Sequence, residues 1–339
     1  MHSLIVKTGA LGDVVRTSYF AKSLKDTLGS SLRLSWFTAP ASADLLRLNP
    51  HIDDLWFEFA HAQPFRFDRI YSLDDERSII DGVMGLDSAA LTGAVLQAGS
   101  PAYTDDAAEW FDMGLISRLG KLRADELKKA NRRSHAEIFR SMFKVEDVKP
   151  HFYLDEACRA WAQDQLPNRS SARIGINPYS GGRWPSKELR PPELRRLIAS
   201  LLGGAAPFAT EPNIVLIGAG PDYSKNLALA AELNSRRVAA VCTDKSVQHL
   251  AAVVGGLDYL ITSDSLALHL AVAQNVPFTA FFSPTSAAEI DDWGIGTKLI
   301  STADDYCSYR KDADNTSITA ERILEAVAKN PRIRPGRAP

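Results

Sequence analysis

The segment that most constrains the fold is residues 258–271, where an apolar run of strand length ends in polar residues just before an apolar helical pattern. The polar residues are Thr262-Ser263-Asp264-Ser265, and a Leu- and Ala-rich stretch follows them. Hydroxyl groups and a carboxylate therefore lie at a strand-to-helix junction. In α/β sheets this is the place where ligands bind.

The chemistry of such a junction suits a phosphate group. The first turn of a helix has unpaired N–H groups and a partial positive charge. His269 lies about one turn further along and faces roughly the same way, so it would add a donor. The alternative is that Ser263, Asp264 and Ser265 only cap the helix and that His269 is a satisfied core histidine. The pattern alone leaves both interpretations open.

Length and composition limit the class of protein. A chain of 339 residues is too long for one ordinary core and predicts two domains. The net charge of −2 provides no overall basic field for nucleic acid or for adhesion to a membrane. Three cysteines without metal or redox spacing, no signal peptide and no apolar run of transmembrane length indicate a cytoplasmic protein.

The N-terminus predicts a strand at 3–6, a glycine-containing loop and a helix at 14–28. Gly9 and Gly12 let the backbone turn tightly and approach a ligand. Asp13 falls at or beside the helix N-cap, where the helix dipole favours a carboxylate able to accept a proton. A structural cap is the alternative, because Gly9-x-x-Gly12 is not the full dinucleotide fingerprint.

Short strands and helices then alternate, which predicts a doubly wound parallel sheet. The region 82–133 is less regular and ends in a basic cluster, which we interpret as a solvated helix face or, alternatively, as a site for an anionic acceptor. The linker 167–171 follows two predicted helices, so we place the boundary there. This gives domains at 1–166 and 172–330 and a flexible tail at 331–339.

The second half predicts strands at 173–178, 213–218, 238–242 and 277–282, the last of these being the final strand. The loop 179–187 can wrap a diphosphate with backbone N–H groups while Arg183 or Lys187 neutralises its charge. A final amphipathic helix is predicted at 318–329.

Four segments together resemble the bacterial ADP-heptose heptosyltransferases, glycosyltransferase family nine. Residues 4–17 are similar to the opening of that family. The later matches are Gly182-Arg183-Trp184-Pro185, Thr262-Ser263-Asp264-Ser265 with His269-Leu270-Ala271, and Phe282-Ser283-Pro284-Thr285 with Trp293-Gly294. They follow the order and spacing of the family across nearly the whole chain.

The resemblance implies an α/β protein of GT-B architecture, with two Rossmann-like, doubly wound parallel-sheet domains facing a cleft. It implies inverting, metal-independent transfer of a heptose from ADP-heptose to an acceptor hydroxyl, with no further cofactor. Asp13 matches the proposed general base. Asp312-Ala313-Asp314 looks like a metal-binding pair, but we interpret it as a chance match in a polar loop.

Donor and acceptor residues are assigned on the same basis. The donor set is Ser180, Gly181, Gly182, Arg183, Lys187, Asp222, Lys245, Asp264, Ser265, Leu266 and His269; the acceptor set is Thr8, Gly9, Gly12, Arg16, Lys128 and Arg132. Gly182 stands where many relatives carry a lysine, so the cation on the phosphate must be Arg183, Lys187 or another residue. Leu266 replaces a usual glycine, and Asp222 is displaced by one residue from the expected ribose-binding carboxylate.

The function predicted from these features is transfer of heptose to a lipopolysaccharide core or a related surface glycan. The expected partners are a nucleotide-sugar and a glycan or glycolipid, with peripheral contact at the inner membrane face and no nucleic acid. Two alternatives remain: transfer to a protein or small-molecule acceptor, and a GT-B nucleotide-sugar epimerase or silent binder.

Overall fold

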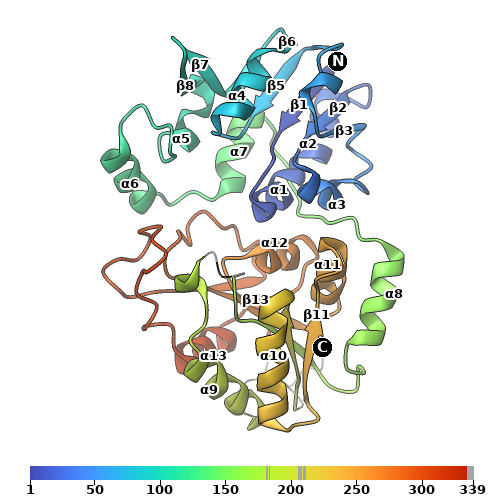
Figure 1. The fold of residues 1–339 in the computed structure, drawn as a ribbon, viewed down its shortest axis with the longest axis vertical. Helices are drawn as coiled ribbons and strands as arrows, with labels where there is room; N and C mark the ends of the chain where they lie inside the picture. The colour runs from blue at the N-terminus through green and yellow to red at the C-terminus, as the bar shows by residue number, and fades with distance from the viewer. Residues whose placement is uncertain (181, 183, 205–207, 209–210, 334–339) are drawn as a thin grey trace. The chain divides into compact units, whose positions relative to one another are not determined.

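Two six-stranded sheets organise the chain, each in its own unit (Figure 1). The computed structural model describes residues 1–180, 182, 184–204, 208 and 211–333. Unit 1 comprises Met1–Tyr153 with Ala288–Asp291, and unit 2 comprises Leu154–Ala287 with Asp292–Pro339.

The sheet of unit 1 has the order β3-β2-β1-β5-β7-β8, in which only β8 runs antiparallel to its neighbour. Its strands are β1 His2–Val6, β2 Arg33–Phe37, β3 Asp54–Trp56, β5 Arg69–Ser72, β7 Leu91–Gln97 and β8 Ser100–Tyr103. A separate pair joins β4 Arg66–Phe67 to β6 Asp87–Ser88.

Helices pack around this sheet through apolar and aromatic side chains. They are α1 Leu11–Ser18, α2 Phe20–Leu28, α3 Ala43–Leu46, α4 Arg77–Met84, α5 Ala108–Phe111, α6 Lys121–Ala130 and α7 His135–Phe143, with short 3₁₀ turns at η1 Pro40–Ser42, η2 Phe59–His61 and η3 Asp105–Ala107. Phe20 of α2 stacks on Phe143 of α7 with ring centroids 4.8 Å apart. The single helix predicted at 14–28 is instead two helices. The first begins at Leu11 and ends at Ser18, and the second begins at Phe20.

The segment 288–291 completes unit 1 at the start of α7. The Glu289 carbonyl accepts a hydrogen bond from the His135 N–H at 2.9 Å, and the Ser134 hydroxyl lies 3.4 Å from an Asp291 carboxylate oxygen. Ser134 and Glu137 also form a capping box, which satisfies two N–H groups at this helix end. A short excursion from the second half of the chain thus belongs to the first unit.

The sheet of unit 2 is parallel throughout, with the order β11-β10-β9-β12-β13-β14. Its strands are β9 Arg173–Asn177, β10 Asn213–Gly218, β11 Val238–Cys242, β12 Tyr259–Ser263, β13 Phe278–Phe282 and β14 Gly296–Ile300. The prediction that 277–282 is the last strand is wrong. The edge strand β14 was missed because a Gly-Thr-Lys start gives no apolar run.

The helices of unit 2 are α8 Glu156–Gln165, α9 Pro191–Leu202, α10 Gly220–Leu233, α11 Val247–Gly255, α12 Leu266–Ala273 and α13 Ala320–Ala328, with a 3₁₀ turn η4 Pro185–Lys187. One core joins Ile174, Ile214 and Ile261 of the sheet to Leu197 of α9 and Ile323 of α13. None of the helices described is long and apolar enough to cross a bilayer.

Helix α8 belongs to unit 2, so the division lies between Tyr153 and Leu154 and not after residue 166 as the linker predicted. The Asp155 N–H donates to the Gln248 side chain at 3.0 Å, and the rings of Trp161 and His249 meet edge to face. Packing of α8 on α11 therefore outweighs the composition of the linker. Of the predicted tail, Ile333 packs against the unit 2 core, and 334–339 lie outside the described residues.

Both sheets place their first strand beside their fourth long strand, as in a dinucleotide-binding fold. In unit 1 the strands that follow β1 in sequence lie on one side of it, and β5 and the later strands lie on the other side. The strand order thus reverses between β1 and β5, and it reverses in the same way between β9 and β12 in unit 2. Ligands bind outside the carboxyl ends of the strands at such a reversal. Each unit therefore has a defined position for a site.

The β7–β8 hairpin provides a stability test. Gly93 has φ +113°, and a Cβ atom there would lie 1.9 Å from the Ser72 carbonyl oxygen. We expect Gly93→Ala to lower the free energy of unfolding by about 3 kcal/mol or more, measured by urea titration, because backbone strain adds to the clash.

The matched control is Gly99→Ala in the turn of the same hairpin. Gly99 also has a positive φ, +78°, but a Cβ atom there meets nothing within 4 Å. Gly99→Ala should lower the free energy of unfolding by only about 1 kcal/mol. Equal losses in the two variants would contradict the packing described for Gly93.

Candidate functional site

A hydrogen-bonded group of polar side chains joins the carboxyl ends of β9 and β12 in unit 2. The Asn177 amide donates to the hydroxyl oxygens of Thr262 at 3.2 Å and Ser265 at 3.1 Å, and these two hydroxyls lie 3.0 Å apart. The two strands on either side of the reversal are thus tied together where a ligand would bind.

Ser265 occupies the N-cap position of α12, as the sequence predicts. In the part of the chain that the structure describes, however, its hydroxyl caps no helix N–H group. The bonds to Asn177 and Thr262 hold this hydroxyl instead. The Leu268 N–H donates to the Ser265 carbonyl at 3.1 Å, so the anion-binding character of this helix start lies in the N–H groups of Leu266 and Ala267.

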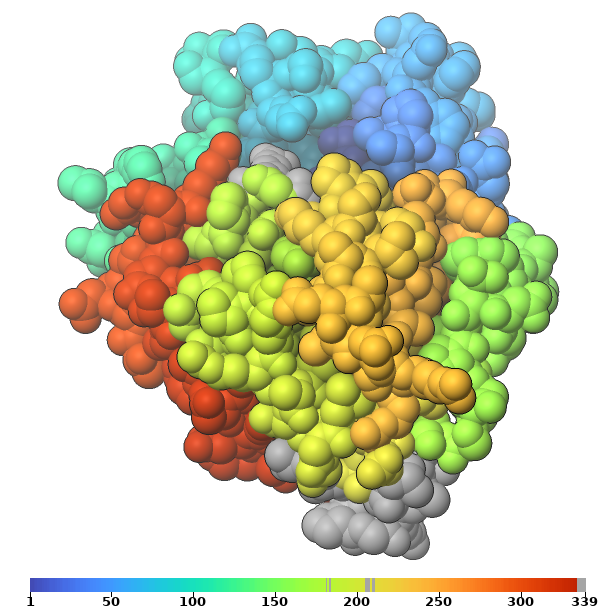
Figure 2. Space-filling view, turned by 60° about the horizontal axis from the view of Figure 1, so that its bottom comes forward, coloured from blue at the N-terminus to red at the C-terminus, as the bar shows by residue number. Residues whose placement is uncertain are grey.

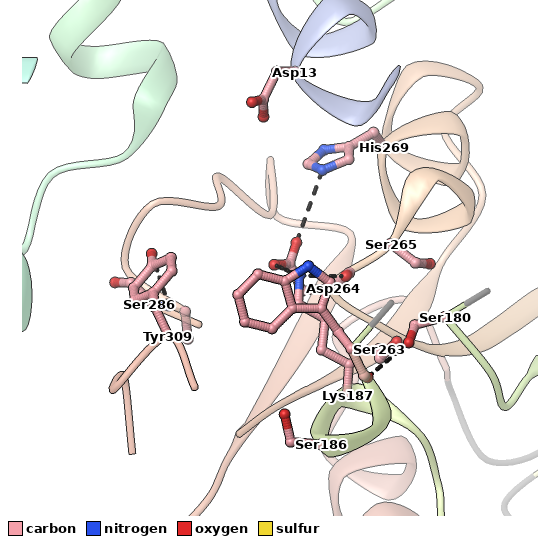
Figure 3. A network of polar contacts seen from close by, with 12 residues as sticks. Asp13, Ser180, Ser186, Lys187, Ser263, Asp264, Ser265, His269, Ser286 and Tyr309 are labelled. Atoms are coloured by element: carbon pink, nitrogen blue, oxygen red, sulfur yellow. Dashed lines mark hydrogen bonds and ion pairs between the residues drawn. The ribbon is translucent and has the colours of Figure 1, made fainter. Parts of the chain in front are cut away.

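Asp264 lies directly beside this helix end and is paired with a lysine. Lys187 Nζ donates to Asp264 Oδ2 at 2.8 Å and to the Asp264 carbonyl at 3.1 Å. His269 Nε2 lies 3.9 Å from Asp264 Oδ1, which is an ion-pair distance rather than a hydrogen bond. Figure 3 shows Lys187, Asp264 and His269 gathered together, with Ser265 beside them.

The charge state of Asp264 follows from these neighbours. Burial by itself would raise the pKa of this carboxyl group. The positive charge of Lys187 and, next, the electrostatic interaction with His269 more than offset burial, so the pKa of Asp264 falls from its ordinary value near 3.8 to about 2. Asp264 is therefore ionised at neutral pH.

The loop that carries Lys187 is held at both ends. The Ser180 hydroxyl donates to the Trp184 carbonyl at 2.8 Å, and the Leu189 N–H donates to the Pro178 carbonyl at 2.8 Å. Lys187 Nζ also lies 5.7 Å from the centre of the Trp184 ring. The charge of this lysine is thus already balanced by Asp264 before any phosphate arrives.

The remaining predicted donor residues are distributed along the same sheet edge. Asp222, after β10, pairs with Lys225 at 3.0 Å, and Lys245, after β11, lies 5.0 Å from the Trp161 ring centre. Gly182 is exposed, with φ +74°. Gly181 and Arg183 lie outside the described residues.

A cavity of about 370 Å³ lies elsewhere on unit 2, between α9 and α10. Figure 2 shows these two helices, yellow-green and yellow, side by side at the surface. Tyr179, Glu188, Arg195 and Lys225 contribute to its lining, but no predicted donor residue does. It lies between two helices that cover the sheet, and we do not assign the donor site to it.

In unit 1, Asp13 is the third residue of α1 and not its N-cap, which is Ala10. Asp13 Oδ1 pairs with Arg16 Nη2 at 2.8 Å. The Arg16 guanidinium lies 5.5 Å from the centre of the Trp110 ring. Arg16 is therefore a neighbour that compensates the charge of Asp13.

A carboxylate that the sequence analysis missed, Asp74, holds the loop before α1. One of its oxygens accepts from the Thr8 N–H at 2.6 Å and from the Thr8 hydroxyl at 2.7 Å, while Lys7 Nζ pairs with the other. Asp74 follows β5, which neighbours β1. Its position directly after a short strand was the available signal.

The other predicted acceptor residues separate into two groups. Gly9 lies in the loop before α1, and Gly12 is the second residue of that helix. Lys128 and Arg132 lie on and after α6, which Figure 1 shows at the edge of unit 1 and apart from α1. The structure thus places Lys128 on α6 and Arg132 in the segment between α6 and α7.

Among the described residues, no group of three or more His, Cys, Asp or Glu side chains is arranged to hold a metal ion. Asp312 pairs with Arg310, and an Asp314 carboxylate oxygen accepts from the Thr316 N–H at 2.7 Å. The two aspartates of the Asp-x-Asp sequence are thus engaged with separate partners.

Solved structures share this fold across nearly the whole chain. A family 9 glycosyltransferase from Veillonella parvula has 16% identity and a TM-score of 0.72, with 96% of this chain and 95% of that chain covered. The E. coli heptosyltransferase WaaC, solved with ADP, has 16% identity and a TM-score of 0.65, covering 97% and 100%. E. coli ADP-heptose lipopolysaccharide heptosyltransferase II has 14% identity and a TM-score of 0.68, covering 96% and 97%. The fold is therefore that of the GT-B glycosyltransferases.

The family follows from the sequence itself. A family model described as glycosyltransferase family 9 (heptosyltransferase) matches residues 132–318, which is more than half of the chain. This protein belongs to glycosyltransferase family 9, the heptosyltransferases. No curated protein matches the chain by sequence.

The Lys187–Asp264 pair generates a double-mutant test. We expect Lys187→Ala to lower the free energy of unfolding by about 2–3 kcal/mol at pH 7, because it leaves a largely buried carboxylate without its cation. Adding Asp264→Asn should recover at least half of that loss. Urea unfolding of the two single variants and the double variant measures both effects.

Arg310→Ala is the control, since it breaks an ion pair between exposed side chains and should leave stability nearly unchanged.

The pH dependence of the stabilisation by the Lys187–Asp264 pair has a defined sign. Because the pKa of Asp264 is lowered in the fold, its stabilisation is present above pH 4 and is lost as the pH falls towards 2. The difference in the free energy of unfolding between wild type and Lys187→Ala should therefore become smaller as the pH falls from 4 towards 2. A double variant no more stable than Lys187→Ala would contradict this account.

Proposed function

We propose that this protein transfers a heptose from ADP-heptose to a hydroxyl group of a glycan or glycolipid acceptor, such as a lipopolysaccharide core, from the cytoplasmic side. Membership of the heptosyltransferase family supports the donor. WaaC, which shares the fold, was solved with ADP and with an ADP-2-deoxy-2-fluoro heptose. The acceptor and the chemical roles below are part of the proposal.

The observation that carries the proposal is the uncapped start of α12 at the reversal between β9 and β12. A diphosphate at this position would accept hydrogen bonds from the first-turn N–H groups, and the helix dipole would stabilise its charge. His269, one turn further along, would add a donor from its imidazole ring.

Asp264 would not contact the phosphates directly, because its negative charge would repel them. We assign it a positioning role: it fixes Lys187, and through Lys187 the loop after β9, against the start of α12. With Lys187 balanced by Asp264, the cation that neutralises the leaving diphosphate would have to be another residue, for which Arg183 is the candidate.

The transfer itself needs a proton acceptor and a stabilised leaving group. In an inverting displacement the acceptor oxygen loses its proton as it attacks the anomeric carbon, and the bond from that carbon to the diphosphate breaks. Asp13 would take the proton. The growing negative charge on ADP would be stabilised at the start of α12, so this scheme requires no metal.

Arg16 defines a condition on that role. Pairing with a guanidinium lowers the basicity of a carboxylate. In this scheme Arg16 keeps Asp13 ionised and oriented until the acceptor hydroxyl binds, and proton transfer requires this ion pair to loosen. The pair would hold the carboxylate in one orientation for the incoming hydroxyl.

Replacement of Asp13 tests the proposed base. We expect Asp13→Asn to lower kcat roughly 100-fold or more, because a general base typically contributes at least that much. The affinity for ADP, measured by calorimetry, should stay within a few-fold of wild type. ADP release from ADP-heptose in the presence of a glycolipid acceptor reports the rate.

Asp26→Asn is the matched control, since Asp26 is also paired with a cation in unit 1 but is exposed on α2. It should keep full activity. Full activity in Asp13→Asn would refute the base. A wild-type protein that binds ADP-heptose but transfers to no glycolipid would favour another acceptor or the silent binder.

A further inference from the structure

We infer that Trp110 of unit 1 is a positioning residue for the transfer, because its indole ring holds the Arg16 guanidinium beside Asp13. The inference rests on the proposed role of Asp13 as proton acceptor, and it adds a residue that acts through Arg16. Trp110 lies on the short helix α5, far from Asp13 in the sequence. Only the fold of unit 1 brings these side chains into one group.

The Arg16 guanidinium lies between a carboxylate and an aromatic ring. Its Nη2 pairs with Asp13 Oδ1 at 2.8 Å, and its central carbon Cζ lies over the Trp110 ring, 5.5 Å from the centre. The face of an indole ring attracts a cation, and the attraction is stronger where water is excluded. The Arg16 side chain is only 11% exposed. The surroundings therefore favour a strong contact between this cation and the ring.

Packing on α7 fixes the Trp110 ring. The ring meets those of His135 and Phe139 at 90° and 89°, with centroids 5.4 Å and 5.1 Å apart. Such edge-to-face pairs are favourable and directional. The neighbouring Glu109 also accepts a hydrogen bond at 2.6 Å from Arg133, which lies just before α7. The ring thus presents a rigid face to the guanidinium.

The contact between Trp110 and Arg16 should contribute most during proton transfer. Before the reaction, the negative charge of Asp13 balances Arg16. As Asp13 takes the proton of the acceptor hydroxyl, it loses this charge and the ion pair loosens. An unpaired charge that is largely buried is costly. The face of the Trp110 ring then stabilises the cation, so this contact is stronger in the transition state than in the resting protein.

Replacement of the ring tests this role. An interaction that strengthens in the transition state affects kcat and not the binding of substrate. We therefore expect Trp110→Leu, which keeps an apolar side chain without a ring, to lower kcat roughly tenfold. The KM for a glycolipid acceptor and the calorimetric affinity for ADP should stay within about twofold of wild type. ADP release from ADP-heptose reports the rate.

Two further variants separate the ring from the volume that it fills. Trp110→Phe retains an aromatic face and should recover most of kcat. Trp110→Met fills the space with a flexible apolar side chain and should behave as Trp110→Leu does. Circular dichroism verifies the fold of each variant, and the two variants without a ring provide independent tests.

A double-mutant cycle with Arg16 separates positioning from packing. In an Arg16→Met background no cation lies over the ring, so adding Trp110→Leu should lower kcat by less than about twofold more. Equal losses from Trp110→Leu in both backgrounds would show that Trp110 only supports the packing of unit 1, and would overturn the inference.

Phe65→Leu is the matched control. The Arg33 guanidinium lies over the Phe65 ring at 4.8 Å and pairs with Asp54 at 2.7 Å, so this group has the same three components. Arg33 and Asp54 are the first residues of β2 and β3, whereas the loop before α1 follows the last residue of β1. Because these strands are parallel, the control lies at the opposite edge of the sheet. It should keep the kcat of the wild type.

The same assays distinguish failure of the inference from failure of the proposed function. Unchanged kcat in Trp110→Leu, with an inactive Asp13→Asn, would overturn the inference and leave the proposed base in place. No transfer by the wild type, or full activity in Asp13→Asn, would refute the proposed function and with it the role of Trp110.

Discussion

The ion pair between Lys187 and Asp264 is the interaction on which the candidate donor site depends. It joins the loop after β9 to the end of β12, the two neighbouring strands at which the strand order of unit 2 reverses. Taking both charges out of water is costly, and their mutual attraction compensates only when the geometry is good. The second bond from Lys187 to the Asp264 backbone carbonyl supplies that geometry. Together they set where α12 begins.

Unit 1 uses the same device with different residues. Asp74 follows the strand beside β1 and holds both Lys7 and Thr8, the two residues that lead into α1. In both units a carboxylate after one central strand anchors the loop after the other. The chemistry proposed for each unit, a proton acceptor in one and an anion site in the other, is built next to such an anchor.

Sequence reasoning located the β12–α12 junction in unit 2 because the sequence pattern there is distinctive. An apolar strand, a polar junction and an Ala-rich helix follow one another within about fifteen residues. It missed Asp74, since a carboxylate after a strand looks like an ordinary turn residue. It also missed α10, whose start Gly220-Pro221 indicates a loop, and β14, a short edge strand. Local patterns cannot show which unit a helix packs on, and for that reason α8 was assigned to the wrong side of the boundary.

The central claim is that the diphosphate of the donor docks at the start of α12, next to the Lys187–Asp264 pair. Hydrogen exchange of the backbone amides with and without ADP tests this directly, because bound phosphates would occupy the first-turn N–H groups. We expect ADP to slow exchange in residues 263–268 and 184–189 and to leave α6 unchanged. Slowed exchange elsewhere, with none in residues 263–268, would contradict the account.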